Sequence, residues 1–202
     1  MLKALIIANE FPPTGGAGVQ RTAKFVKYLR KYGYEPIIVT KDHPGSVVDE
    51  SLLNDIPKDV EIHRLKAYDT MNRAGVMRIP MKVLGSRILS PDSEFFWYYF
   101  NREKVVEIAK HNDVDVVYTT SFPYSAHLFG LYLKRVMPEL PWVCDFRDEW
   151  TNNPYHLDSF SRRLKLKLEK KKEHEVTSEF NYFITNTPLM LEGFLADNQK
   201  LK

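Results

Sequence analysis

Short apolar runs that are typical of β-strands alternate with helical patterns along almost the whole chain. The first run covers 2–8, and it is followed by a glycine-rich turn and by a helical pattern over 19–32 that stops at Gly33. Further strand patterns occupy 37–40, 60–65, 114–119, 142–146 and 182–185. Strands separated by helices require right-handed crossovers, which place helices on both faces of a parallel sheet. The sequence therefore predicts an α/β fold with a doubly wound, Rossmann-like parallel sheet.

The remaining helices are predicted from helical periods and from their start and stop signals. A helical pattern over 94–111 carries six consecutive aromatic residues, and a second begins at Ser125, its expected cap, and stops before Pro138. A long amphipathic pattern covers 158–179, and Thr187 followed by Pro188 has the signature of one more helix start. Between 66 and 90, glycine and proline interrupt the apolar residues, so only short helical pieces are expected there.

Composition limits the class of protein. The chain has 202 residues, of which 44% are hydrophobic and 27% charged, enough to bury a core, and we expect a single domain over 1–202. No apolar run approaches the length of a membrane span. The only cysteine, Cys144, cannot form an internal disulfide, which fits a reducing interior and predicts a cytoplasmic location. A net charge of +3 gives no argument for a nucleic-acid partner.

Positive charge is clustered on the long helical pattern. The cluster, Arg162–Lys172, consists of Arg162, Arg163, Lys165, Lys167, Lys170, Lys171 and Lys172. Interleaved glutamates favour a solvated helix face with ion pairs between successive turns. The alternative is a peripheral contact with anionic lipid at the inner face of the cytoplasmic membrane.

A glycine-rich turn links the first strand to the first helix. It contains Gly15, Gly16 and Gly18, and Arg21 follows one turn into the helix. The turn is neither a Walker loop nor the dinucleotide fingerprint Gly-x-Gly-x-x-Gly. Glycines allow a close approach of backbone to a ligand, and a helix N-terminus offers unpaired amides to an anion, so a phosphate site is predicted with Arg21 as its charge partner. A tight turn without a ligand is the alternative.

Two further loops follow predicted strands and carry polar residues. The loop after 114–119 contains Ser121, Tyr124 and His127, which could bind a sugar through donors and acceptors, although His127 could equally be a helix residue satisfied by its neighbours. Ser121 lacks the Gly-x-Ser-x-Gly setting of a hydrolytic nucleophile.

The second of these loops, after 142–146, contains Asp145, Arg147, Asp148 and Glu149. Buried charges are costly unless they pair or face a ligand, so this loop either binds substrate or contains an ion pair that only shapes it. The carboxylates could also hold a divalent metal, but no second acidic or histidine cluster is evident in the sequence, and no metal is expected.

The aromatic run over 95–100 is expected to be mostly core. Because six consecutive residues cover every side of a helix, some of these rings must face a loop, solvent or a partner. Trp97 is the candidate for stacking on a sugar.

Four spaced blocks of sequence together resemble bacterial family-four glycosyltransferases. The blocks are Glu10-Phe11-Pro12-Pro13 with Gly15-Gly16, Pro91-Asp92 with Trp97, the stretch from Ser121 to Gly130, and the stretch from Pro141 to Asp148. The resemblance implies a GT-B architecture of two Rossmann-like domains and transfer of a sugar, with retention, from a nucleotide donor to an acceptor. The chain would be the N-terminal, acceptor-side domain, and the C-terminal donor domain with its Glu-x7-Glu signature would begin near or after Leu201. Such a piece is expected to be inactive alone.

The resemblance also implies roles for single residues. Gly15 and Gly16 would approach the donor phosphates, His127 would lie near the reacting sugar, and Asp145, Arg147 and Asp148 would shape the acceptor side. With the residues proposed above, this makes His127 and Asp148 the catalytic candidates and makes Ser121, Tyr124, Asp145, Arg147 and Trp97 the candidates for binding the acceptor or substrate. Relatives often have His where Tyr124 stands and Pro where Glu149 stands. No cofactor or metal is implied, because the nucleotide-sugar is a substrate and its diphosphate leaves by a front-face displacement. The acceptor would be lipid-linked or a saccharide, in the synthesis of a cell-envelope or exopolysaccharide precursor.

Two other functions are compatible with the same patterns. A nicotinamide-dependent dehydrogenase would use the strand, glycine turn and helix together with Asp42 after the second strand, although the fingerprint is missing. A non-catalytic carbohydrate-binding or assembly module would use the sheet only as a scaffold.

Overall fold

The computed structural model describes residues 1–42, 47–67, 91–152 and 160–197, and within them a single six-stranded sheet. Its strands are β1 (Leu2–Ile7), β2 (Tyr34–Lys41), β3 (Glu61–Leu65), β4 (Val116–Thr120), β5 (Trp142–Phe146) and β6 (Tyr182–Thr185). The strand order is β3-β2-β1-β4-β5-β6, and every neighbouring pair is parallel. The direction of winding changes between β1 and β4, which confirms the predicted doubly wound, Rossmann-like α/β fold.

The helices follow the predicted patterns closely. They are α1 (Ala17–Leu29) with the short continuation η1 (Arg30–Tyr32), η2 (Glu50–Asp55), α3 (Phe95–His111), α4 (Ser125–Val136), α5 (Phe160–Thr177) and α6 (Pro188–Asp197). Gly33 ends the first of them with a φ of 85°, a left-handed conformation that favours glycine. The short helix η2 has no predicted counterpart. The helical pieces expected between 66 and 90 lie largely outside the described residues, as does the expected start of α5 at Asp158.

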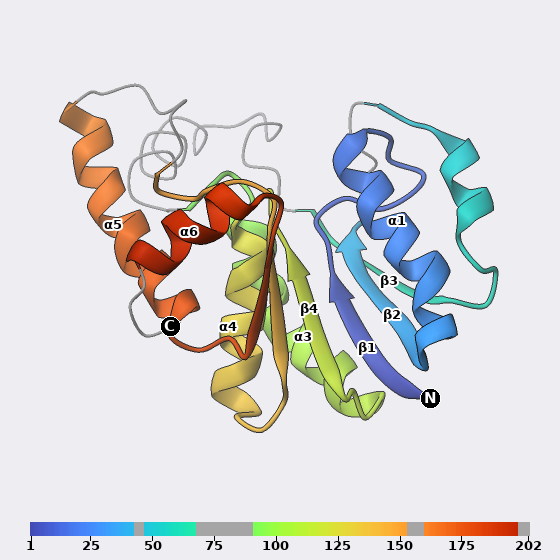
Figure 1. The fold of residues 1–202 in the computed structure, drawn as a ribbon. Helices are drawn as coiled ribbons and strands as arrows, with labels where there is room; N and C mark the ends of the chain where they lie inside the picture. Colours follow the sequence, from blue (N-terminus) through green and yellow to red (C-terminus); the bar gives the residue numbers. More distant parts are fainter. Residues whose placement is uncertain (43–46, 68–90, 153–159, 198–202) are drawn as a thin grey trace, which may run out of the picture.

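Successive residues of the central strand β1 belong to different cores. Leu5 and Ile7 pack in the cluster formed by α3, α4 and the sheet, whereas Ile6 packs with Ala23 and Val26 of α1. This alternation follows from the two-residue period of a strand. Figure 1 shows the result, with α1 on one face of the sheet and α3 and α4 on the other.

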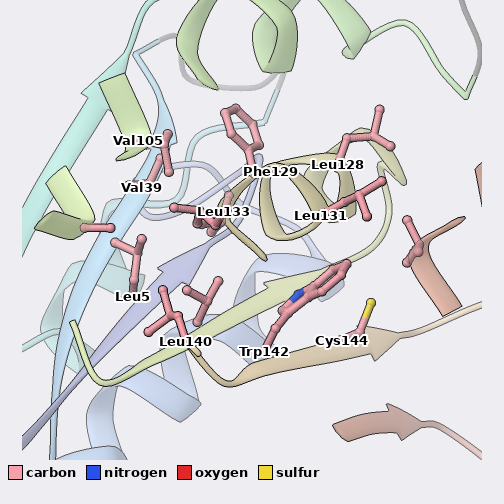
Figure 2. Packing of buried hydrophobic residues seen from close by; sticks show 14 of the residues in the cluster. Leu5, Val39, Val105, Leu128, Phe129, Leu131, Leu133, Leu140, Trp142 and Cys144 are labelled. Carbon is pink, nitrogen blue, oxygen red and sulfur yellow. The ribbon is translucent and has the colours of Figure 1, made fainter. Parts of the chain in front are cut away.

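The helix α4 is packed against the sheet over the indole of Trp142, a residue of β5 (Figure 2). Trp142 is 1% exposed, and its Nε1 donates to Thr119 Oγ1 at 2.8 Å. A Cβ atom added at Gly130 of α4 would lie 2.2 Å from Trp142 Cε2. Glycine at this position therefore allows the helix to approach the ring closely.

The N-terminus of α4 is capped by a residue that is distant in the sequence. Tyr124 occupies the N-cap position without a side-chain capping bond, and Ser125, the predicted cap, is the first residue of the helix. Instead, Asp92 Oδ2 accepts from the Ser125 amide at 2.9 Å, and Asp92 Oδ1 accepts from Ser125 Oγ at 2.7 Å and from the Glu94 amide at 3.0 Å. Burial raises the pKa of Asp92. Asp92 thus joins the starts of α3 and α4, and the expected role of Ser125 is corrected.

The cap expected for α6 is confirmed, because Thr187 Oγ1 accepts from the Met190 amide at 3.2 Å. Within the described part of the chain, no helix combines the length and the apolar character needed to cross a bilayer.

Candidate functional site

The candidate site lies at the carboxyl ends of β1, β4 and β5, beside the N-terminus of α1. In a doubly wound sheet, ligands bind outside this edge at the point where the strand order reverses, here between β1 and β4. The three loops that the sequence singled out leave these strands, so the fold brings them to one edge.

The three glycines differ in their surroundings: Gly15 and Gly16 precede α1, whereas Gly18 lies in its first turn. A Cβ atom at Gly15 would lie 3.0 Å from Val47 Cγ1, and the Gly15 amide donates to Val47 O at 2.9 Å, so Gly15 holds the turn against residues 47–49. A Cβ atom at Gly18 would lie 2.5 Å from Arg147 Nη1. A Cβ atom at Gly16, where φ is 115°, would have no heavy atom of the described residues beyond its chain neighbours within 4 Å. Of the three, Gly16 alone faces open space at the helix N-terminus.

Asp145 is a fully buried carboxylate at the end of β5, and donors surround it. Its Oδ1 accepts from Arg21 Nη2 at 2.8 Å, and its Oδ2 accepts from Thr120 Oγ1 at 3.0 Å and from the hydroxyl of Tyr118. Burial and the neighbouring carboxylate raise the pKa of Tyr118, so this phenol stays protonated and donates. Both carboxylate oxygens thus accept hydrogen bonds from protein groups, so Asp145 links α1, β4 and β5 at this edge of the sheet.

Arg147 lies against the glycine turn. Its Nε donates to Thr120 Oγ1 at 3.0 Å and its Nη2 to Thr22 Oγ1 at 3.1 Å, while Nη1 occupies the space beside Gly18. Burial lowers the pKa of Arg147, but an arginine remains protonated in proteins. Among the described residues no hydrogen bond of Nη1 is found, so this N–H group can still donate.

The two arginines have different surroundings from those that the sequence suggested, while their predicted binding roles stay predictions. Arg21, expected as the charge partner of a phosphate, is neutralised by Asp145 at 2.8 Å and also bonds Asn186. Arg147, expected on the acceptor side, is the guanidinium that contacts the glycine turn. Asn186, which follows β6, donates to the carbonyl of Arg147 and so ties the two arginines together.

A small hollow of about 50 Å³ opens beside the glycine turn. Its lining includes Asn9, Glu10, Gly18, Phe122 and Arg147. Asn9 is 7% exposed, and its Oδ1 is buried without a hydrogen-bond partner among the described residues. No binding role was predicted for Asn9 or Glu10 from the sequence; their position in the loop that leaves β1 is the signal that could have indicated one.

His127 lies in the core beneath α4 and not at the edge of the sheet. It is 0% exposed, and its ring centroid lies 4.6 Å from that of Phe146. Its Nδ1 is 2.9 Å from Thr119 Oγ1 and 3.2 Å from Cys144 Sγ. Burial, with a smaller effect of Arg147, lowers the pKa of His127 to about 3. An imidazole enclosed in this way does not reach a bound sugar, so its role here is in packing and not the predicted catalytic one.

Trp97 and Tyr124 are also enclosed. Trp97 is 1% exposed and packs edge-on against Phe129, with ring centroids 4.8 Å apart, so it presents no free face to a sugar. Tyr124 stacks on Trp150 at 4.8 Å and donates its hydroxyl hydrogen to Glu149 O at 2.8 Å. Trp97 therefore packs α3 against α4, and Tyr124 contacts the loop after β5.

Ser121 and Asp148 differ in their exposure. Ser121 is 1% exposed; its Oγ donates to Asp145 O and accepts from the Arg147 amide, both at 3.3 Å. Asp148 is exposed, and within the described ranges its carboxylate has no hydrogen bond or ion pair. The described residues contain no group of three or more His, Cys, Asp or Glu side chains that could hold a metal ion.

The remaining candidates are committed to other contacts. Asp42 Oδ1, considered for a nicotinamide cofactor, accepts from the Ala67 amide at 2.7 Å. In the basic cluster, Lys165 pairs with Glu169 at 3.5 Å, and Lys172 lies 5.4 Å from the ring centroid of Phe95, where burial lowers its pKa. Lys167, Lys170 and Lys171 are exposed, whereas the side chains of Arg162 and Arg163 lie outside the described residues.

A scan against protein-family models and a search of curated proteins found no match for this sequence. Solved structures do match. A protein from Listeria monocytogenes described as a UDP-N-acetylglucosamine 2-epimerase matches at 15% identity over 98% of this chain and 43% of its own, with a TM-score of 0.57. Staphylococcus aureus MnaA, solved with UDP, matches at 12% identity over 98% of this chain and 41% of its own, also at 0.57. MurG of Acinetobacter baumannii matches at 14% identity over 93% of this chain and 42% of its own, with a TM-score of 0.48.

At these identities the likeness shows the fold alone, a Rossmann-like α/β domain. The chain spans less than half the length of each of these structures.

Proposed function

We propose that this chain is the N-terminal, acceptor-side domain of a retaining glycosyltransferase that uses a nucleotide-sugar. The substrate on the acceptor side would be a lipid-linked or saccharide precursor of the cell envelope or of an exopolysaccharide. A second Rossmann-like domain would supply most of the contacts to the nucleotide, and this chain alone would not turn over substrate. The reaction needs no resident metal or cofactor in this proposal.

The open turn at Gly16 is the observation that carries the proposal. It lies at the N-terminus of α1 beside the switch point between β1 and β4, with a guanidinium, Arg147, adjacent at Gly18. The first turn of α1 contains no acidic residue. Helix dipole, backbone amides and arginine therefore all favour a negative group at this place. In a sugar transfer they would stabilise the diphosphate as it leaves.

The test compares two substitutions at the first position of α1, one that adds a negative charge and one that does not. Ala17 is exposed, so Ala17→Glu should leave the fold intact, since a carboxylate at a helix N-terminus is stabilising. The same carboxylate should repel a diphosphate. We expect UDP, titrated into the ¹⁵N-labelled chain, to shift the amide resonances of residues 16–18, and we expect Ala17→Glu to weaken this binding about tenfold relative to Ala17→Gln, the neutral control of equal size. Equal UDP binding by the two variants would contradict the assignment.

The proposal also includes a peripheral contact between α5 and the membrane. If the acceptor is lipid-linked, the exposed Lys167, Lys170 and Lys171 of α5 would meet anionic lipid at the inner face of the cytoplasmic membrane. Flotation with phosphatidylserine vesicles at physiological salt tests this contact, and absence of the protein from the floated fraction would remove it.

A further inference from the structure

Arg147 is a cation at the edge of the sheet that has no ion pair within the described residues. The nearby carboxylate of Asp145 pairs instead with Arg21, at 2.8 Å. Burial lowers the pKa of Arg147, and the charge of Asp145 opposes this effect. A partly buried cation that keeps its charge is stabilised when an anion binds beside it.

Two threonine hydroxyls hold the guanidinium of Arg147. Its Nε donates to Thr120 Oγ1 at 3.0 Å, and its Nη2 donates to Thr22 Oγ1 at 3.1 Å. Thr22 and Thr120 are 0% and 2% exposed, so water does not compete for either hydroxyl. Because the guanidinium is planar and rigid, two fixed nitrogen atoms also fix the direction of the third, Nη1.

Nη1 is the nitrogen of this guanidinium that is left for a ligand. It makes no hydrogen bond within the described residues, and it is not one of the enclosed side-chain atoms that lack a partner. It lies 2.5 Å from where a Cβ atom at Gly18 would be, in the first turn of α1. The first amides of a helix have no partner within that helix, so Nη1 and these amides can donate to the same anion.

The two threonines differ in their other contacts. Thr120 Oγ1 also donates to Asp145 Oδ2 at 3.0 Å, so it belongs to the network of the buried carboxylate. The Thr22 hydroxyl has no hydrogen bond within the described residues except the one from Arg147. Removal of the Thr22 hydroxyl therefore releases one side of the guanidinium and leaves the hydrogen bonds of Asp145 intact.

We propose that Thr22 and Thr120 are positioning residues, which hold the Arg147 guanidinium so that Nη1 donates to a phosphate group at the N-terminus of α1. Their role rests on the proposed function, since that phosphate belongs to the diphosphate of the nucleotide-sugar. Neither threonine contacts the phosphate, because each acts through the guanidinium. Serine keeps the hydroxyl that this role requires, whereas valine keeps only the branched shape of threonine.

UDP titrated into the ¹⁵N-labelled chain tests the role of the hydroxyl, with the backbone amides of residues 16–18 as the readout of affinity. We expect Thr22→Val to weaken UDP binding about tenfold, the loss expected for one hydrogen bond to a charged group, and Thr22→Ser to stay within about twofold of the wild-type chain. Thr177→Val is the matched control. It removes a buried hydroxyl that donates to His174 O at 3.1 Å in α5, and it should leave UDP binding unchanged.

The guanidinium supplies a second readout in the chain without ligand. Hydrogen bonds to the guanidinium slow the rotation of its Nη groups, so the Nη signals of Arg147 should be separate in the wild-type chain, in Thr22→Ser and in Thr177→Val. We expect these signals to merge in Thr22→Val. Their absence in Arg147→Lys identifies them.

The positioning role is overturned if Thr22→Val and Thr177→Val bind UDP equally well, or if the Nη signals stay separate in Thr22→Val. It is also overturned if Thr22→Ser binds UDP as weakly as Thr22→Val, because the packing of the threonine methyl group would then explain the loss. A wild-type chain without a UDP response at residues 16–18 would instead overturn the proposed function, and the Nη signals would still decide whether the threonines hold the guanidinium.

Discussion

Two buried polar side chains of this molecule, Asp145 and His127, differ in how fully their polar atoms are hydrogen-bonded. At the carboxyl ends of the strands, both oxygens of Asp145 accept hydrogen bonds, from Arg21, Thr120 and Tyr118. Beneath α4, His127 contacts Thr119 and Cys144 through Nδ1, but its Nε2 has no partner among the described residues. The first region keeps a charge out of water, whereas the second keeps an ionisable ring neutral.

The difference shows what each region requires. An ionised carboxylate is tolerated inside a protein only where donors and an opposite charge replace the water. A neutral imidazole needs less, and the pKa of about 3 at His127 records that protonating it there is unfavourable. The edge of the sheet therefore stabilises a buried charge through hydrogen bonds and an ion pair. The region beneath α4 holds a neutral ring through packing.

The largest expected effect is at Asp145. The substitution Asp145→Ala removes the carboxylate that pairs with Arg21 and lies near the charge of Arg147. We expect the free energy of unfolding to fall by about 3 kcal/mol, the lower end of the usual range because the side chain of Arg21 is 29% exposed. Urea unfolding measures this loss. Asp148→Ala, at the exposed carboxylate three positions on, is the control and should change stability by less than about 0.5 kcal/mol. Similar losses in the two variants would abolish the contrast between the regions.

The second prediction concerns packing beneath α4. Gly130→Ala drives a methyl group into the indole of Trp142, and we expect a loss of about 2 kcal/mol despite the better helix propensity of alanine. In α6, a Cβ atom at Gly193 would lie 3.3 Å from Glu149 Oε1, the flexible end of a side chain that can move. Gly193→Ala should therefore leave stability unchanged or raise it. Thermal unfolding compares the two variants. Equal unfolding temperatures would show that the Trp142 ring moves aside without loss of stability.

The smallest effect is a pH dependence at His127. The imidazole has a folded pKa of about 3, below its ordinary value of 6.5, so the unfolded chain binds the extra proton between these values. Stability from this group is complete above the ordinary pKa and is lost as pH falls toward the folded pKa. Between about pH 5.5 and about pH 4.5 this loss amounts to about 1 kcal/mol.

Urea unfolding at the two pH values, compared between the wild-type chain and His127→Gln, isolates that contribution, because the other titrating groups are common to both. The glutamine variant should lose about 1 kcal/mol less. If the two chains lose the same stability, the ring is protonated in the folded state and the contrast with Asp145 fails.

Much of the architecture was predictable from the sequence, whereas the site was predictable only in its location. The bounds of β5 and β6 are those of their apolar runs, and the alternation of strands and helices predicted the parallel sheet. The glycine turn, however, looks uniform in sequence although only Gly16 is open, because Gly15 and Gly18 are constrained by Val47 and Arg147, which are far away in the chain.

The unexpected surroundings of Arg21 and Arg147 have the same origin. Their spacing from the glycines favoured Arg21, but Arg21 lies 124 positions from the carboxylate that neutralises it. Asn9 was overlooked for the corresponding reason, since a missing hydrogen-bond partner cannot be recognised before its surroundings are known.

The sequence by itself determined the elements and their order, because the periods of apolar residues and the glycine and proline signals act over a few neighbouring positions. Only the tertiary structure decided which charged groups are neutralised, which rings are enclosed and which glycine is open. Those outcomes depend on contacts between strand ends and helix starts such as Asp92 with Ser125, 33 positions apart, and no local pattern encodes such a distance. Burial and hydrogen bonding, which fix the chemistry of a side chain, are properties of the assembled sheet edge.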